Sequence, residues 1–195
     1  MKKYYVYIVL TRTNTVISRI IHGIKREEYT HASISLDMQL HSMYSFGRKN
    51  TYNPFIGTFR KEDIDKGVFN LCDVLPGAII QLEVTRLQYE RVKMMIEIFI
   101  SNKHIYKYNY MGLIHNLLNK PAVIENRFLC SEFVYYLLKE SGIINLHISR
   151  NLVRPQSFIH IDGKIIYKGD LKSFNLTNDY SIEGVTPLTI SAQFD

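Results

Sequence analysis

The segment CSEFVYYLL, residues 130–138, limits the fold of this chain more than any other part of its sequence. From residue 133 to 138 the side chains are apolar or aromatic, so a helix here has no polar face. Such a helix belongs inside a domain, surrounded by the rest of the chain. The chain has 195 residues, which is enough for one domain with a core of this kind and short for two. We therefore predict a single domain over residues 1–195.

The other apolar patterns predict strands and helices that can surround this helix. Residues 4–10 are apolar, aromatic and β-branched, which is typical of a buried strand. Thr85 and Gln88 form a capping box, which predicts a helix that runs to about residue 100. Further helices are predicted over 13–25, 108–120 and 130–141, and further strands over 31–36, 40–46, 69–71, 78–84 and 164–169. This order predicts an α+β fold in which one antiparallel sheet packs against the helices.

The segment THASISLDMQLHSMYSF predicts a β-hairpin. Its first strand alternates polar and apolar side chains, so His31 and Ser33 share a polar face, which we expect to meet a cleft or water. If Asp37 and the next residue form a tight turn, His31 faces Tyr44 and Ser33 faces Ser42. Glycine, asparagine and proline follow the hairpin and predict a loop over 47–59.

Charge and composition favour some partners over others. The chain has 24 Lys and Arg against 18 Asp and Glu, a net charge of +6, and these cations are scattered along it. Because no block of like charges occurs, no nucleic acid is expected as a partner, although a diffuse positive surface can still favour acidic partners or anionic membranes. No apolar stretch approaches the ~18 residues of a membrane span, so no integral membrane segment is expected. The two cysteines are far apart and no secretory signal is recognised, which predicts a cytoplasmic protein with reduced thiols.

Cys130 stands where the apolar helix begins, and two explanations are open. Free cysteine packs well in cores, but a helix N-terminus also lowers the pKa of a thiol and makes it a nucleophile. A catalytic cysteine needs a base, and among the seven histidines His31 is favoured by its place on a strand. Glu132 would oppose a thiolate, so we expect it to point away or to pair with a cation. Cys72 is most simply a buried packing residue.

Together, THASISLD and FLCSEFV resemble segments of the circularly permuted papain-like cysteine hydrolases. These form part of the NlpC-type superfamily; the YaeF/YiiX-like branch is the most similar, and lecithin retinol acyltransferase is a distant relative. The segments MYSFGRKN, NPFIG and VRPQSF add to the resemblance, which covers residues 4–171. It implies a permuted papain-like fold, with Cys130 as nucleophile and His31 as base.

The resemblance also implies a third polar residue on the returning strand of the hairpin, where it would orient the imidazole. In the predicted register this strand offers Tyr44 and Ser42 but no carboxylate or amide. The expectation is therefore a dyad with a Tyr or Ser helper, or weak catalysis. Ser131, beside the nucleophile, and Arg48, after the hairpin, are candidate substrate contacts; a solvated loop charge is the alternative for Arg48.

The predicted function is that of a cysteine hydrolase that cleaves an amide of a peptide or amino-acid derivative through a thioester. Two alternatives share the fold: a hydrolase or acyltransferase acting on a lipid ester, and a non-catalytic ligand-binding module. A third is a basic protein that binds nucleic acid or anionic lipid through its surface. The sequence contains no pattern typical of a zinc, calcium or phosphate site, so no metal or cofactor is expected.

Overall fold

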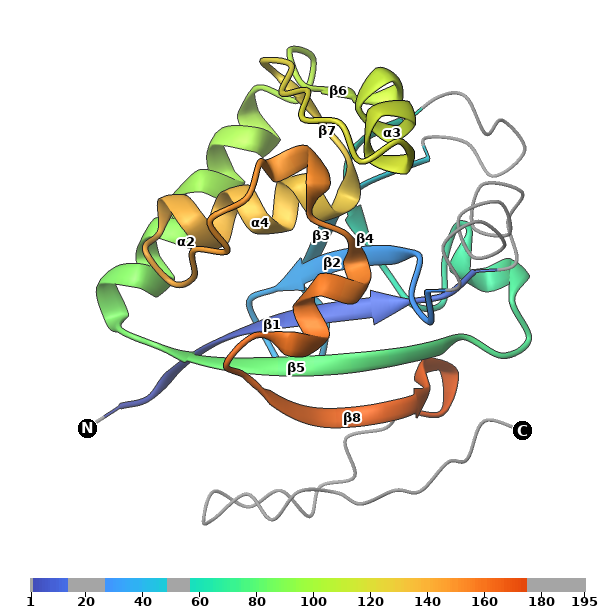
Figure 1. The fold of residues 1–195 in the computed structure, drawn as a ribbon. Helices are drawn as coiled ribbons and strands as arrows, with labels where there is room; N and C mark the ends of the chain where they lie inside the picture. Colours follow the sequence, from blue (N-terminus) through green and yellow to red (C-terminus); the bar gives the residue numbers. More distant parts are fainter. Residues whose placement is uncertain (1, 14–26, 49–56, 175–195) are drawn as a thin grey trace.

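The computed structural model describes residues 2–13, 27–48 and 57–174. Within these residues, six strands form one antiparallel sheet in the order β4-β3-β2-β1-β5-β8 (Figure 1). The strands are β1 (Tyr4–Thr11), β2 (His31–Ser35), β3 (Met43–Arg48), β4 (Gly57–Glu62), β5 (Pro76–Val84) and β8 (Lys164–Asp170). The α+β prediction with an antiparallel sheet is confirmed.

Three α-helices and four short 3-10 helices connect and cover these strands in the described part of the chain. The α-helices are α2 (Arg86–Ser101), α3 (Tyr110–Leu117) and α4 (Cys130–Glu140), and the 3-10 helices are η1 (Phe69–Leu71), η2 (Arg150–Leu152), η3 (Pro155–His160) and η4 (Leu171–Ser173). Two short strands, β6 (Lys107–Tyr108) and β7 (Arg127–Phe128), pair in parallel beside α3. Helix α4 packs against β2 and β3, and α2 packs against α4 and β1.

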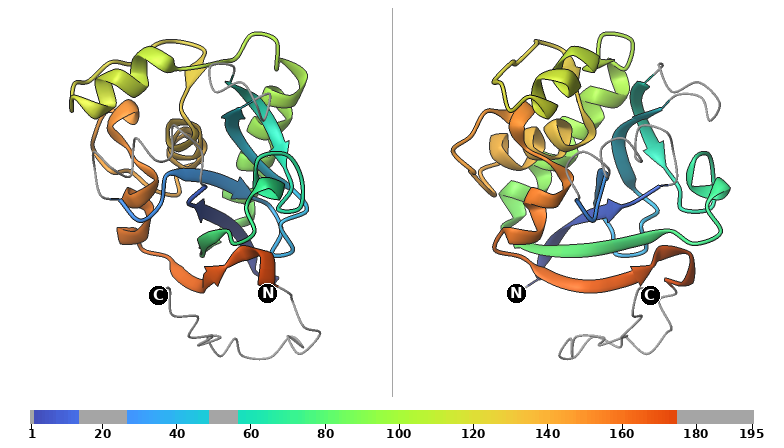
Figure 2. Two further views of the ribbon diagram at one scale, coloured as in Figure 1. Left: turned by 90° about the vertical axis from the view of Figure 1, so that its right-hand side faces the viewer. Right: turned by 45° about the vertical axis from the view of Figure 1, so that its right-hand side comes forward.

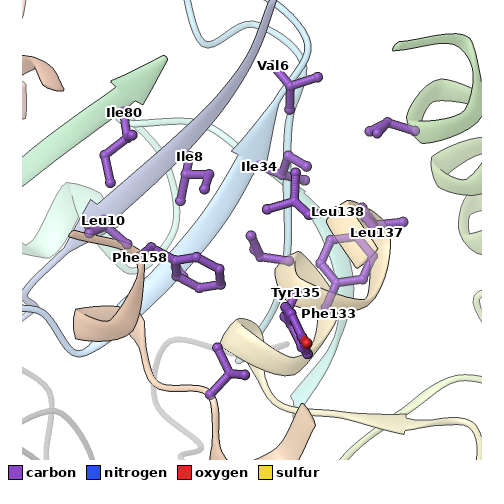
Figure 3. Packing of buried hydrophobic residues seen from close by; sticks show 14 of the residues in the cluster. Val6, Ile8, Leu10, Ile34, Ile80, Phe133, Tyr135, Leu137, Leu138 and Phe158 are labelled. Atoms are coloured by element: carbon purple, nitrogen blue, oxygen red, sulfur yellow. The ribbon is translucent and has the colours of Figure 1, made fainter. Parts of the chain in front are cut away.

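Helix α4 lies in the main core, as its apolar composition predicts. Phe133, Leu137 and Leu138 are fully buried and pack in one cluster with Ile8 of β1 and Ile34 of β2 (Figure 3). Burying one such side chain contributes about 1.5–3 kcal/mol relative to exposure. This packing fixes the position of α4 relative to the sheet, and with it the position of the residue at which the helix begins.

Several other predictions are confirmed. The predicted first strand is β1, and α2 begins at its predicted cap, where the Thr85 hydroxyl accepts the Gln88 N–H and the Gln88 side chain accepts the Thr85 N–H. Helix α4 ends before Gly142, which has a φ of +69° and so adopts the left-handed conformation that glycine favours after a helix.

Three element predictions were wrong. Phe69–Leu71 was expected as a strand but is the 3-10 helix η1, and the next strand, β5, begins at Pro76 rather than at residue 78. The end of the predicted loop 47–59 contains the start of β4, an edge strand. The predicted helix over 13–25 and the middle of that loop fall almost entirely outside the described residues.

The register predicted for the hairpin was also wrong. Ser35 pairs with Met43 and Ile34 pairs with Tyr44, which moves the partner strand by three residues. The cause is a longer turn: the Asp37 carboxylate accepts the N–H groups of His41 and Ser42 and so stabilises a loop instead of a tight turn. Since neighbouring strand residues face opposite sides, this shift places different side chains beside His31.

Among the described residues, no helix is long and apolar enough to cross a membrane.

Candidate active site

Cys130 is the first residue of α4, and the chain reaches it in an extended conformation. The preceding Leu129 has φ −80° and ψ 168°, and the strand β7 lies just before it. A helix of this length gives its first residue the partial positive charge of its N-terminus, where the first N–H groups lack partners within the helix. The Cys130 side chain is therefore placed at the N-terminal end of α4, beside these N–H groups.

His31 is the first residue of β2, and its ring nitrogen Nε2 faces a carboxylate. Nε2 lies 3.2 Å from Oε1 and 3.1 Å from Oε2 of Glu62. The ring also packs edge-on against Phe69, with 6.0 Å between the ring centroids. The imidazole also lies near the side chain of Cys130, which lines the same cleft and helps to raise the pKa of His31. The structure thus brings together the two residues that the sequence singled out.

Glu62 is the residue that the sequence analysis missed. It is the last residue of β4, two strands away from β2, and its side chain is almost fully buried. It accepts a hydrogen bond of 2.5 Å from the Ser33 hydroxyl, and the Gly47 backbone approaches it so closely that a Cβ there would lie 3.0 Å from Oε1. The carboxylate absent from the returning strand of the hairpin is therefore supplied by the next strand.

The surroundings of His31 and Glu62 favour the charged form of both side chains. Burial lowers the pKa of His31, but its interactions with Glu62 and Cys130 outweigh burial and raise that pKa to about 10. Burial likewise raises the pKa of Glu62, but His31, Ser33 and Ser45 together outweigh it and lower that pKa below its usual value. At neutral pH His31 is therefore an imidazolium held against an ionised carboxylate.

The polar face of β2 was expected to meet a cleft or water, and it does so at His31, which lines the cleft, but not at its serines. Ser33 and Ser35 are both fully buried; Ser33 binds Glu62, and the Ser35 hydroxyl donates to the Asp37 carbonyl at 2.8 Å. This side of the sheet is covered by a second apolar cluster that includes Phe69. The hydroxyl groups of these serines form hydrogen bonds with buried partners and do not contact solvent.

Glu132 points away from the cleft and pairs with a cation, as expected. It is fully buried and accepts hydrogen bonds from the Leu129 N–H at 2.7 Å and from Asn109 Nδ2 at 3.1 Å. Arg150 Nε lies 4.0 Å from its Oε1 atom. Burial raises the pKa of Glu132, although these three groups favour its charged form. The network fixes the turn that leads into Cys130.

His31, Glu62 and Cys130 line one cleft of the molecule. Leu113 and Leu117 of α3 form part of an apolar wall of this cleft. Three cationic side chains and two further acidic ones also line it: Arg60, Lys66, Arg154, Glu27 and Asp63. The cleft therefore offers the nucleophile a site with both apolar and charged surroundings, which suits recognition of a small molecule or a peptide end.

The other predicted site residues lie elsewhere or have their polar groups engaged. The Tyr44 ring stacks on Phe59 with 6.0 Å between centroids, on the face of the sheet that carries Ile34, and Ser42 lies in the turn. Neither is brought to His31. Ser131 lines the cleft, but its buried hydroxyl donates to the Val153 carbonyl at 2.6 Å. Arg48 ends β3, and its side chain is outside the described part of the structure.

Within the described residues, no group of three or more His, Cys, Asp or Glu side chains is arranged to hold a metal ion. Cys72 and Cys130 are both free and buried. Comparisons with protein-family models, with curated proteins and with solved structures found no match. The geometry of the cleft is accordingly the basis for a functional assignment.

Proposed function

We propose that this chain is a cysteine hydrolase with a permuted papain-like fold, in which Cys130 attacks an acyl carbonyl. The observation that carries the proposal is the contact of the His31 imidazole with both Cys130 and Glu62 inside one cleft. A nucleophile, a base and a group that orients the base, placed together in one cleft, are what nucleophilic catalysis requires.

The order of these parts along the chain supports the permuted arrangement. The histidine lies early, on a strand in the middle of the sheet, and the cysteine lies later, at the start of a helix packed on that sheet. Papain-like enzymes without the permutation have the cysteine first. The resemblance in sequence around His31 and Cys130 and the arrangement of their elements therefore support the same fold.

The first half of the reaction forms a thioester. In the proposed mechanism the thiol proton of Cys130 is held by His31 when the sulfur attacks; because Nε2 faces Glu62, we assign Nδ1 to the sulfur. The thiolate attacks the carbonyl carbon, and N–H groups in the first turn of α4 stabilise the resulting oxyanion. The C–N bond then breaks as the imidazolium gives its proton to the leaving amine, which leaves the acyl group on the sulfur.

The second half releases the acid. Neutral His31 takes a proton from a water molecule, which attacks the thioester carbon. The C–S bond breaks, the carboxylic acid leaves, and the sulfur returns as a thiolate beside the imidazolium. No external oxidant or reductant enters the cycle. If an alcohol or amine replaces water, the same steps transfer the acyl group to it, so transfer to an acceptor is the second reaction that the site can support.

Glu62 is the residue that orients His31 in the proposed mechanism. Because its carboxylate faces Nε2, it fixes the imidazole ring and the tautomer, and it stabilises the imidazolium. The non-catalytic binding module was favoured by the apparent lack of such a group on the hairpin. With a buried carboxylate on β4 in this place, catalysis is the better explanation. We propose an amide of a peptide or amino-acid derivative as the substrate and a lipid ester as the alternative.

Trapping of the acyl intermediate tests this function without knowledge of the natural substrate. We expect p-nitrophenyl acetate to release p-nitrophenol in a burst and peptide mapping to find the acetyl group on Cys130. The Cys130→Ser variant should lose the burst, while Cys72→Ser should keep it, because Cys72 packs in the second apolar cluster. Acetylation of both cysteines at equal rates, or of neither, would contradict the proposal.

A further inference from the structure

Helix α3 exposes several large apolar side chains to solvent. Its sequence, YMGLIHNL, is apolar almost throughout, and a helix of that kind is normally buried. Yet Met111 is 55% exposed, Ile114 is 50% exposed and Leu118, just after the helix, is 61% exposed. Their spacing of three and four residues places them on one face of α3. We call Met111, Ile114 and Leu118 the α3 outer face.

The opposite side of α3 already has a role in the fold. Gly112 and Asn116 are buried, and Leu113 and Leu117 line the cleft that holds Cys130. The outer face therefore does not stabilise the described part of the fold. Helix α3 lies at the end of the molecule opposite β8 in every view of the ribbon (Figures 1 and 2). Exposed apolar side chains grouped in this way mark an interaction surface.

The charges around the outer face indicate which partner it suits. Residues 103–127 contain four Lys or Arg and one acidic residue, Glu125. Lys107, before α3, and Lys120, after it, are both exposed. Val123, in the same segment, is a further exposed apolar side chain, at 56%. Apolar side chains flanked by cations are the composition of segments that lie in the interface of an anionic membrane.

Helix α2 shows that exposed apolar side chains alone do not give this pattern. Met94 is 54% exposed and Ile98 is 45% exposed, but the charges on this helix are mixed: Glu90 and Glu97 are exposed beside three exposed cations. Acidic side chains oppose approach to an anionic surface. The segment around α3 has four cations and one acidic residue, so its positive charge is less compensated, and α2 provides a control.

We propose that the α3 outer face, with Lys107 and Lys120, docks on the surface of an anionic lipid bilayer. The apolar side chains enter the interface while the two lysines contact anionic headgroups. Docking in this way does not depend on the proposed hydrolase reaction. Because the other side of α3 lines the cleft, a docked molecule would hold Cys130 one helix away from the lipid.

Vesicle sedimentation with the full chain tests this proposal. We expect binding to phosphatidylcholine vesicles that contain phosphatidylglycerol, weaker binding to phosphatidylcholine alone, and a decrease with added salt. Ile114→Glu combined with Leu118→Glu should weaken binding at least about tenfold, because two carboxylates replace the inserted side chains. Met94→Glu combined with Ile98→Glu should leave it unchanged. Circular dichroism checks that both double variants fold.

Further variants test the contribution of the two lysines to vesicle binding and show whether binding depends on the proposed hydrolase reaction. Lys107→Glu combined with Lys120→Glu should weaken binding to the anionic vesicles, whereas Lys93→Glu on α2 should not. Cys130→Ser should bind as the wild type does, so a failed hydrolase assay leaves this proposal standing, and the reverse also holds.

Three outcomes would overturn the docking proposal. The first is no binding to either vesicle, and the second is equal loss of binding in the α2 and α3 double variants. The third is self-association of the wild type in light scattering that the α3 double variant abolishes, without vesicle binding; the outer face would then contact a second copy of this chain.

Discussion

His31 Nε2 lies 3.1 Å from Oε2 of Glu62, although the two residues are 31 positions apart and belong to strands separated by β3. This contact determines how the candidate site is charged. The carboxylate accepts from Ser33 and faces the imidazole, and the imidazole contacts Cys130. A buried carboxylate in this position is retained only when its partners compensate for its lost hydration, so each partner gives a testable effect.

Replacing Glu62 by Gln tests its role as the orienting group. The amide keeps the shape but not the charge, so the imidazolium loses its main stabilisation and the pKa of His31 should fall. We expect the burst with p-nitrophenyl acetate to slow by roughly a hundredfold, as loss of a positioned acid–base group does. Glu125→Gln, at an exposed acidic residue, is the control. If the burst is as fast in Glu62→Gln as in the wild type, Glu62 does not take part in the reaction.

The two buried serines of β2 provide a matched pair. Ser33 donates to Glu62, whereas Ser35 donates to the Asp37 carbonyl in the turn that follows β2. Either change to Ala should destabilise the fold by about 1 kcal/mol, since one buried hydrogen bond is lost. Only Ser33→Ala should also raise the pKa of Glu62 and slow the acylation of Cys130. Urea unfolding and the burst assay measure the two effects separately, and equal rates for both variants would count against the Glu62 network.

The dependence of stability on pH follows from the two shifted pKa values. The pKa of His31 is raised from 6.5 to about 10, so its contribution is fully present below about pH 6.5 and is lost as the pH rises through about 10. The pKa of Glu62 is lowered from 4.5, so its contribution is present above about pH 4.5 and is lost as the pH falls through the lowered value. We expect the unfolding free energy of wild type minus Glu62→Gln to decrease steadily from pH 6.5 to 10. A difference that stays constant across this range would show that the pair does not titrate in this way.

Asn109 tests whether the cleft wall and the nucleophile are linked. Its side chain accepts the Gly112 N–H at the start of α3 and donates to Glu132 behind Cys130. Asn109→Ala should therefore destabilise the protein by about 1–2 kcal/mol, because a helix cap and a buried hydrogen bond are lost together. Asn102→Ala, at the exposed end of α2, should have a much smaller effect in the same urea titration. Similar losses in the two variants would show that the link through Glu132 adds nothing.

The elements that the sequence predicted well are those whose signal is local. The cap at Thr85, the apolar run from Phe133 and the strand around Ile8 each lie within a short window, and all three appear as expected. The pairing of His31 with its neighbours depended on one turn. Asp37 stabilises a longer loop there, which no alternation of side chains within the strands reveals.

Glu62 could not be predicted in the same way because its role arises from contacts distant in sequence. The glycines, asparagine and proline before it indicate a loop, and β4 is an edge strand that exists through its pairing with β3. The local sequence gives little sign of this strand, because Phe59, which faces the main core, is followed by three charged residues and not by an alternating pattern. Once the segment is paired as a strand, Phe59 and Glu62 lie on opposite faces, which places the carboxylate on the face that carries His31.

The measurement that tests the central claim most directly is the pH dependence of iodoacetamide alkylation, followed by mass spectrometry at Cys130 and Cys72. The two cysteines are 8% and 6% exposed, so their overall burial is similar, and Cys130 differs in lining the cleft that holds His31. We predict fast alkylation of Cys130 well below pH 8, with slow alkylation of Cys72 in the same sample. In His31→Ala the fast reaction should be lost or should move to higher pH. If Cys130 instead reacts as slowly as Cys72, and its rate does not change in His31→Ala, Cys130 is a packing residue and the proposed hydrolase function is wrong.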